Sequence, residues 1–215
     1  MGKGFFKLLE YTINGMLDII FPPEEVCISC FEEYYVGLCP LCLKKIKRIK
    51  NNKNIFSYGY YVGPLKDLIL SFKYKENYLA AAILGEFLCE IIKENNIKFN
   101  IILYIPLSKK SRKKRGFNQS EILAKIISKK YNIPISNSLV KIKETKEQKT
   151  LSREDRKKNI CDAFSIRNLS DIEGKDIILV DDIITTGFTV LECKKILEKY
   201  GAKTVSIVTV AQSFM

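Results

Sequence analysis

The segment 177–189 constrains the fold of this chain more than any other part of its sequence. It begins with a continuous apolar run and then places two carboxylates, Asp181 and Asp182, next to each other. An unbroken apolar run bounded by charge is typical of a strand that is covered on both faces, as in a parallel sheet flanked by helices. In open α/β sheets of this kind, ligands bind beyond the carboxyl ends of the strands. The two acids are therefore candidates for a binding site.

The turn that follows the acids has the chemistry of a phosphate site. It consists of Thr185, Thr186, Gly187, Phe188 and Thr189. Its hydroxyls and backbone N–H groups precede an expected helix, and helix N-termini stabilise anions. Carboxylates accept hydrogen bonds from ribose hydroxyls or hold Mg²⁺, so the acids and the turn together predict a sugar phosphate. The alternative without a ligand is a helix cap beside two solvated acids, because acidic pairs at strand ends are common.

This segment resembles the motif with which type I phosphoribosyltransferases bind phosphoribosyl diphosphate (PRPP): an apolar strand, two acids and Thr-Gly-x-Thr. The resemblance implies PRPP and Mg²⁺ as ligands. In the mechanism that we expect, Asp181 and Asp182 hold the ribose hydroxyls and favour the positive charge that develops on the sugar. The same acids bind Mg²⁺ directly or indirectly, and the turn 185–189 holds the 5′-phosphate. The two competing phosphate motifs, Gly-x-x-x-x-Gly-Lys-Ser/Thr and Gly-x-Gly-x-x-Gly, are absent.

The charge of the chain is unevenly distributed. Of 215 residues, 36 are Lys or Arg and 24 are Asp or Glu, which gives a net charge of +12. Residues 107–158 hold 17 Lys or Arg and 5 Asp or Glu, so the whole excess lies in this segment. A charge run is usually a solvated face, but this one lies just before the acidic motif in the sequence. Because the chain has no histidine, acid–base chemistry would come from carboxylates, Lys, Tyr, Cys or the substrate.

A loop rich in basic residues follows the apolar strand expected at 100–105. Such a loop at the end of a strand can clamp a pyrophosphate. Gly116 lets the backbone approach a ligand closely, and Asn118 is a suitable cap for a helix at 118–130. The candidate PRPP-binding residues of this loop are Lys109, Lys110, Arg112 and Arg115.

Residues 141–159 contain polar donors with few apolar anchors, which indicates a mobile lid. Closing a lid over PRPP would exclude water and protect a cation-like sugar from hydrolysis. A disordered basic linker is the alternative. The candidate contacts of this lid, with PRPP or with DNA, are Lys141, Lys143, Gln148 and Arg156.

Four of the seven cysteines form two Cys-x-x-Cys pairs with eight residues between them. Two such pairs can close a tetrahedral thiolate site on one Zn²⁺, which would be structural because four ligands fill its coordination. Disulfide or redox chemistry is the alternative, but no secretion signal supports an oxidising compartment. The predicted zinc ligands are Cys27, Cys30, Cys39 and Cys42.

The sequence predicts an N-terminal module at 1–50 and a larger α/β domain at 51–215. An apolar stretch at 1–23 is expected to be a docking helix, with membrane-surface contact as the alternative. No uncharged apolar run of about 18 residues and no signal-peptide cleavage site is present, so we expect a cytoplasmic protein without a membrane span. The expected strands are 57–62, 100–105, 176–182 and 203–211, and the expected helices are 65–74, 79–93, 118–130 and 189–200. A strand, a helix and a strand in succession at the C-terminus predict parallel pairing.

Taken together, these motifs resemble those of ComF-like (GntX-like) phosphoribosyltransferase-fold proteins over nearly the whole chain. The resemblance rests on the four cysteines, 105–108, 115–120, 145–159 and 179–189. It implies a type I phosphoribosyltransferase fold, a mainly parallel sheet flanked by helices, and in some members a part in natural competence and DNA handling. The chain departs from the pattern at Phe188, where a small residue is common, and at Lys141 and Lys143, where arginines are expected.

Two functions are consistent with this sequence. The first is displacement of pyrophosphate from PRPP by an acceptor that the sequence does not identify. The second is a non-catalytic protein that handles single-stranded DNA, together with competence proteins, and keeps the PRPP-type pocket. The local charge motivates the second function, and it would make DNA binding fall steeply with salt. The sequence gives no indication of the oligomeric state.

Overall fold

The computed structural model describes residues 25–50, 54–75, 77–108, 112–113, 116–143 and 163–214. The helix expected within residues 1–23 lies outside these ranges, and so does most of the predicted lid.

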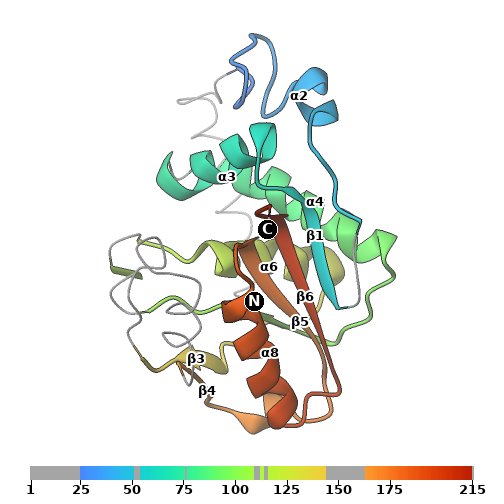
Figure 1. The fold of residues 1–215 in the computed structure, drawn as a ribbon, viewed down its shortest axis with the longest axis vertical. Coiled ribbons are helices and arrows are strands. Elements are labelled where there is room, and N and C mark those ends of the chain that lie inside the picture. The colour runs from blue at the N-terminus through green and yellow to red at the C-terminus, as the bar shows by residue number, and fades with distance from the viewer. Residues whose placement is uncertain are drawn as a thin grey trace, which may run out of the picture.

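Four parallel strands form the central sheet, in the order β1 (Ile55–Tyr60), β6 (Thr204–Gln212), β5 (Asp176–Ile184) and β2 (Ile101–Tyr104). Leu179 of β5 aligns with Leu103 on one side and with Ile207 on the other. The parallel arrangement confirms the pairing that the strand–helix–strand order predicts. All four carboxyl ends therefore meet at one edge, the upper edge in Figure 1.

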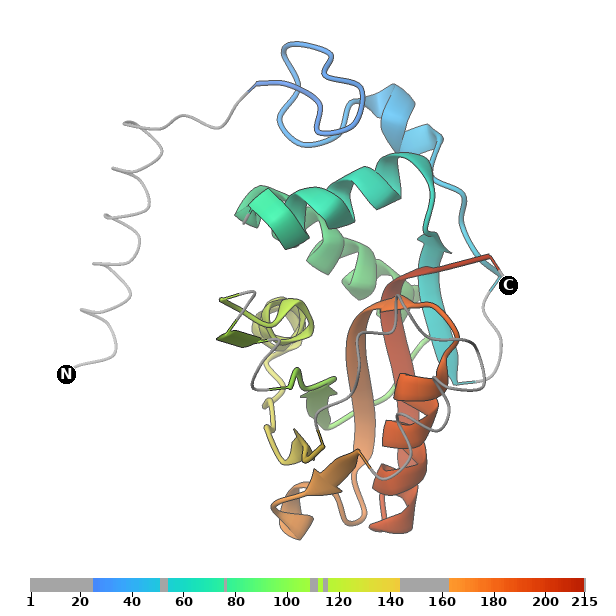
Figure 2. The ribbon, with the colours of Figure 1, turned by 60° about the vertical axis from the view of Figure 1, so that its left-hand side comes forward.

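Helices cover both faces of this sheet, as the apolar strands require. On one face α4 (Tyr78–Glu94) and α6 (Gln119–Tyr131) pack against a core that includes Ile178 and Val180. On the other face α8 (Phe188–Lys199) packs against a second core that includes Ile177 and Leu179 (Figure 2). Successive residues of β5 thus point to opposite faces and reach separate cores.

Helix α3 (Gly63–Lys75) lies beyond the carboxyl ends of the strands rather than on a face (Figure 1). It packs on α4 and contributes the fully buried Leu65, Leu68 and Phe72 to the first core. The ring of Phe72 lies 5.6 Å from that of Phe117, which precedes α6. This helix therefore forms a roof over the edge where ligands bind in such folds.

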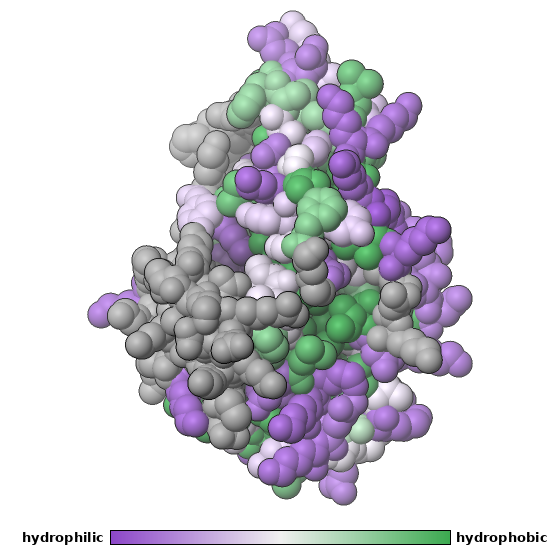
Figure 3. Space-filling view, viewed as in Figure 1, coloured by the Kyte–Doolittle hydropathy of each residue, from purple (hydrophilic) through white to green (hydrophobic). Residues whose placement is uncertain are grey.

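The cysteine-containing segment, residues 25–50, lies above α3 in Figure 1 as far as the short helix α2 (Pro40–Lys44) and then descends beside β1. It is fixed to the rest of the chain by the Ser29 hydroxyl, which donates to Asp67 Oδ2 of α3 at 2.6 Å, and by Ile28 and Leu38, which pack on the first core. Hydrophobic and hydrophilic side chains are interspersed on the surface of this segment (Figure 3), and its exposed large hydrophobic residues include Phe31, Tyr34, Val36 and Leu41.

A second, two-stranded sheet was not expected from the sequence. It pairs β3 (Leu139–Lys141) with β4 (Phe164–Ile166) in antiparallel fashion, and the 3-10 helix η2 (Leu169–Asp171) follows. Strands of three residues are too short to show a period-two pattern. A further difference is the length of β5, which continues past the acids to Ile184 because Ile183 and Ile184 pair with β6.

Candidate functional site

Asp181 is the sixth of the nine residues of β5 and lies opposite Thr209 of β6. Its Oδ1 atom accepts a hydrogen bond from the hydroxyl of Ser120 at 2.9 Å and one from the backbone N–H of Asp182 at 2.9 Å. Two donors to one carboxylate oxygen fix the side chain before any ligand arrives. Ser120 belongs to the first turn of α6, so this helix positions the acid.

Asp182 contacts the roof helix. Its Oδ2 atom lies 2.6 Å from the ammonium of Lys73 of α3, and the two side chains are only 16% and 15% exposed. Its Oδ1 atom accepts a hydrogen bond from the backbone N–H of Ile183 at 2.6 Å. A lysine that is distant in the sequence thus joins the acid pair, and no local sequence signal indicates this contact.

The acid pair has unusual electrostatics. Burial and the negative charge of Asp182 raise the pKa of Asp181 to about 7, against the opposing effects of Ser120 and Lys73. Burial also raises the pKa of Tyr61, an effect that Lys73 opposes and Asp182 reinforces. Near neutral pH the carboxyl of Asp181 is therefore poised between its two protonation states, with a phenol within electrostatic range of the pair.

The predicted phosphate turn lies directly beyond β5, at the start of α8. Gly187 is the N-cap of this helix with φ of 77°, a left-handed conformation that suits glycine. Because glycine has no side chain, Gly187 donates no side-chain cap to the N–H groups of the first helical turn. The side chain of Phe188, at the position where a small residue is common, packs against the second core.

The loop between β2 and α6 is held in place by Asn118. Its side-chain Nδ2 donates to the carbonyl of Ile105 at 3.0 Å, and its Oδ1 accepts from the backbone N–H of Ser120 at 3.0 Å. The second bond confirms the predicted helix cap, and the first ties the cap to the end of β2. Asn118 therefore positions Ser120, which binds Asp181. The neighbouring Gln119 is 2% exposed, and its Nε2 atom has no hydrogen-bond partner in the described part of the chain.

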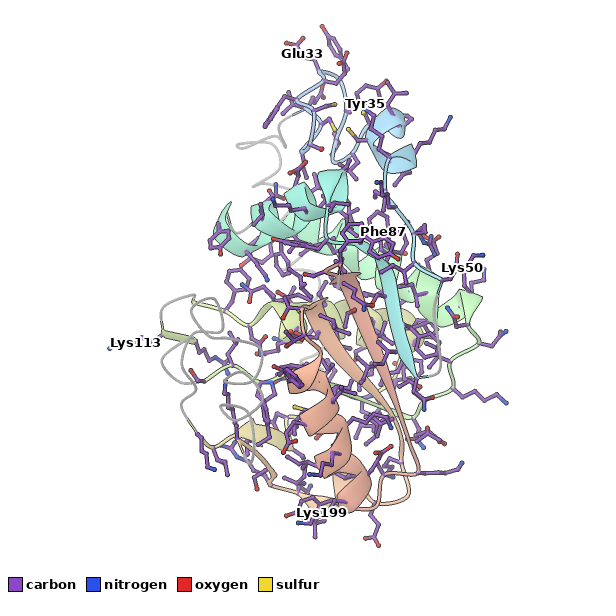
Figure 4. The ribbon with its side chains drawn as sticks, in the orientation of Figure 1. Glu33, Tyr35, Lys50, Phe87, Lys113 and Lys199 are labelled. Atoms are coloured by element: carbon purple, nitrogen blue, oxygen red, sulfur yellow. The ribbon has the colours of Figure 1, made fainter. Side chains whose placement is uncertain are left out.

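Only some of the predicted basic ligands lie in the described ranges. Arg112 forms a 3.4 Å ion pair with Glu121 and its side chain is 62% exposed, while Lys113 extends away from the sheet (Figure 4). Lys141, on β3, places its ammonium 5.8 Å from the ring centre of Phe164, and Lys143 is exposed. The predicted ligands outside the described residues are Lys109, Lys110, Arg115, Gln148 and Arg156.

The four predicted metal ligands converge. The Sγ atoms of Cys27, Cys30, Cys39 and Cys42 all lie within 4.8 Å of one another. None of them forms a disulfide, and the sulfurs of Cys30 and Cys39 are 3.6 Å apart. Burial would raise the pKa of Cys27, but N–H groups of Cys30, Cys39 and Ser29 lower it to about 6. Such a cluster of thiols can hold a metal ion, because the thiolate is the form that binds metals.

Two further observations bear on function. In the part of the chain that the structure describes, no helix is long and apolar enough to cross a membrane. Residues 88–213 match the family model described as "Phosphoribosyl transferase domain". This match begins inside α4, so it contains the acid pair and the turn but neither α3 nor the four clustered cysteines.

Curated relatives match more of the chain. "Competence protein F" of Haemophilus influenzae is 31% identical over 84% of this chain and 82% of its own length. "Competence protein ComFC" of Bacillus subtilis is 28% identical over 92% of this chain and 88% of its own length. "DNA utilization protein YhgH" of Shigella flexneri is 30% identical over 79% of this chain and 75% of its own length. These matches extend over most of the chain and are not confined to the acidic motif.

Proposed function

This chain belongs to the ComF family of proteins with a phosphoribosyl transferase domain, and we propose that it binds PRPP and transfers the phosphoribosyl group to an acceptor, with release of pyrophosphate. The observation that supports this proposal most is the acid pair of β5 beside the glycine-capped start of α8. Carboxylates there can accept from the ribose 2- and 3-hydroxyls while the helix start binds the 5′-phosphate.

The proposed reaction passes through a sugar with cationic character at C1. Asp181 and Asp182 favour this charge, and the hydrogen bonds from Ser120 and from the backbone keep Asp181 in place as the charge develops. Mg²⁺, when bound, would neutralise the diphosphate leaving group, and the same two carboxylates would hold it directly or through water. Histidine is not needed, because positioning and electrostatics carry most of this chemistry.

We further infer that the four cysteines hold one Zn²⁺. In a tetrahedral site with Zn–S bonds of about 2.3 Å, sulfurs lie roughly 3.8 Å apart, which fits a cluster whose atoms lie within 4.8 Å of one another. Four thiolates fill the coordination of the ion, so its role would be to hold the loops of this segment together.

Calorimetric titration with PRPP and Mg²⁺ tests the main proposal. We expect the wild-type chain to bind PRPP and the double variant Asp181→Asn, Asp182→Asn to lose binding. Asp176→Asn is the matched control, because Asp176 lies at the opposite end of the same strand and bonds to Thr204 and Lys203. Unchanged PRPP binding in the double variant would contradict the assignment of the acid pair as the binding site. A pyrophosphate-release assay with bases, amines and DNA then tests turnover and identifies the acceptor class.

The second candidate function is single-stranded DNA handling that keeps the pocket, in association with competence proteins. Two observations favour it. Residues 107–158 contain 17 basic and only 5 acidic residues, and the relatives are named for competence and DNA utilization. Fluorescence polarisation with a labelled oligonucleotide at increasing salt tests it. A basic patch predicts affinity that falls steeply with salt, and negligible binding at low salt would exclude this function.

A further inference from the structure

We propose that Lys73 of the roof helix α3 is a ligand-binding residue of the site and that its ammonium contacts the diphosphate of PRPP. This inference rests on the proposed function and adds to it a residue that lies outside the matched phosphoribosyl transferase segment, 88–213. It gives helix α3 a direct part in binding PRPP.

Lys73 is held at the site by its surroundings. Its ammonium lies 2.6 Å from Asp182, and with a side-chain exposure of 15% it is more enclosed than the other lysines that form ion pairs in the described chain. The preceding residue, Phe72, is 1% exposed and packs near Phe117, which anchors this end of α3. The helix therefore presents the ammonium to the acid pair from a fixed backbone position, and water screens the charge less than at the surface.

The direction of approach indicates which part of PRPP Lys73 would meet. The proposed 5′-phosphate turn begins α8, which packs on the second core, whereas α3 contributes to the first core on the opposite face of the sheet. In PRPP the 5-phosphate and the 1-diphosphate leave the furanose ring on opposite sides of the ring oxygen. With the 2- and 3-hydroxyls on the acids and the 5-phosphate at α8, carbon 1 and its diphosphate point towards α3.

The ion pair with Asp182 orients Lys73 for this contact. An ammonium has three donors, so it can keep the carboxylate and also bind a phosphate oxygen. A diphosphate carries several negative charges and accepts strong, charge-assisted hydrogen bonds. Asp182 would then serve two parts of the ligand: its own oxygens hold the ribose, and its partner Lys73 reaches the leaving group.

A lysine that only tied α3 to β5 would behave differently. Its removal would loosen the roof and weaken every ligand of the site to a similar degree. A lysine that binds the diphosphate affects only ligands that carry one. The comparison of PRPP with ribose 5-phosphate, which shares the sugar and the 5-phosphate but lacks the diphosphate, therefore separates the two roles.

The test is calorimetric titration of Lys73→Met and Lys73→Arg with both ligands in the presence of Mg²⁺. We expect Lys73→Met to weaken PRPP roughly 10- to 100-fold, the effect of one lost charge-assisted contact, and to change ribose 5-phosphate affinity less than about twofold. Lys73→Arg should restore part of the PRPP affinity, because the charge is kept. Lys66→Met is the matched control, since Lys66 lies on the same helix and is exposed.

Several results would overturn the inference. Equal weakening of both ligands would make Lys73 a structural tie, and unchanged PRPP affinity would remove it from the site. If Lys73→Met does not fold, Lys73→Arg decides the question. A Lys73→Arg chain that melts like the wild type but binds PRPP no better than ribose 5-phosphate would contradict a charge contact with the diphosphate. If the wild type binds ribose 5-phosphate and PRPP equally, the inference fails while the sugar-phosphate site stands. If it binds neither, the proposed function fails as well.

Discussion

The pKa of Asp181 depends on a few neighbouring groups, and the hydrogen bond from Ser120 is the one that a single small substitution removes. The hydroxyl of Ser120 lowers the pKa of Asp181, which burial and Asp182 raise. We predict that Ser120→Ala raises this pKa further and weakens PRPP binding roughly three- to tenfold near neutral pH, as expected for one lost hydrogen bond to a carboxylate. Titration calorimetry measures the affinity. Ser128→Ala is the control, because Ser128 lies on the same helix and bonds only to the carbonyl of Ile133 among the described contacts; an equal loss there would contradict the prediction.

Asp171 gives a prediction about pH and stability that is independent of the ligand site. The hydroxyls of Ser138 and Ser136 donate to its Oδ2 atom and lower its pKa below the ordinary 3.8. A depressed pKa in the folded state stabilises the protein above the unfolded pKa, and this contribution is lost as the pH falls through the folded value. We predict that Asp171→Asn lowers the free energy of unfolding by about 1 kcal/mol at pH 7 and that the difference shrinks as the pH falls below 3.8. Urea denaturation across this range checks it, and a difference that grows with acidity would contradict it.

At the scale of elements, the joint between β5 and α8 depends on the conformation of Gly187. Its φ of 77° disfavours any side chain, although a Cβ there would meet only Ile184 and Leu191 at 3.8 Å. We predict that Gly187→Ala costs about 1 kcal/mol of stability and also weakens PRPP, because relief of the strain moves the N–H groups that hold the 5′-phosphate. Gly174→Ala is the matched control: φ is 67° and nothing lies within 4 Å of the added Cβ. Both variants should melt at lower temperature, and only Gly187→Ala should lose affinity in calorimetry.

The elements that the sequence could predict are those with long apolar patterns. Helix α4 is mostly apolar and β5 contains the apolar run 177–180, and the positions of both elements follow from these patterns within a few residues. The end of β5 could not be predicted in this way, because Ile183 and Ile184 belong to the strand only through their pairing with β6. The strands β3 and β4 have three residues each, too few for a periodic signal.

The same distinction applies to the candidate site. The acid pair and the turn are contiguous in sequence, so their chemistry is visible there. The partners of the acids are not: Ser120 is 61 positions from Asp181, and Lys73 lies further still from Asp182. Nothing in the residues around Lys73 distinguishes it from Lys66 on the same helix. Only the packing of α3 above the sheet places Lys73, and not Lys66, beside Asp182.

At the scale of the whole molecule, a continuous series of contacts connects the cysteines to the acid pair. Ser29, between Cys27 and Cys30, donates to Asp67 of α3, and the same helix carries Lys73 to Asp182. A loss of order among the cysteines would therefore reach the helix that roofs the ligand site. Because of this connection, we expect the proposed zinc ion to affect ligand binding as well as stability.

We accordingly predict that loss of the metal weakens PRPP binding. Metal analysis should find one zinc per wild-type chain and none in Cys42→Ser, whose melting temperature should fall by roughly 5–10 °C because structural zinc contributes to folding free energy. PRPP affinity should fall several-fold in the same variant, since α3 loses part of its support. Cys89→Ser is the control, because Cys89 is a buried cysteine on α4 outside the cluster. A Cys42→Ser chain that lacks zinc yet binds PRPP as the wild type does would show that the ion supports its own segment alone, and a wild-type chain without zinc would contradict the metal assignment itself.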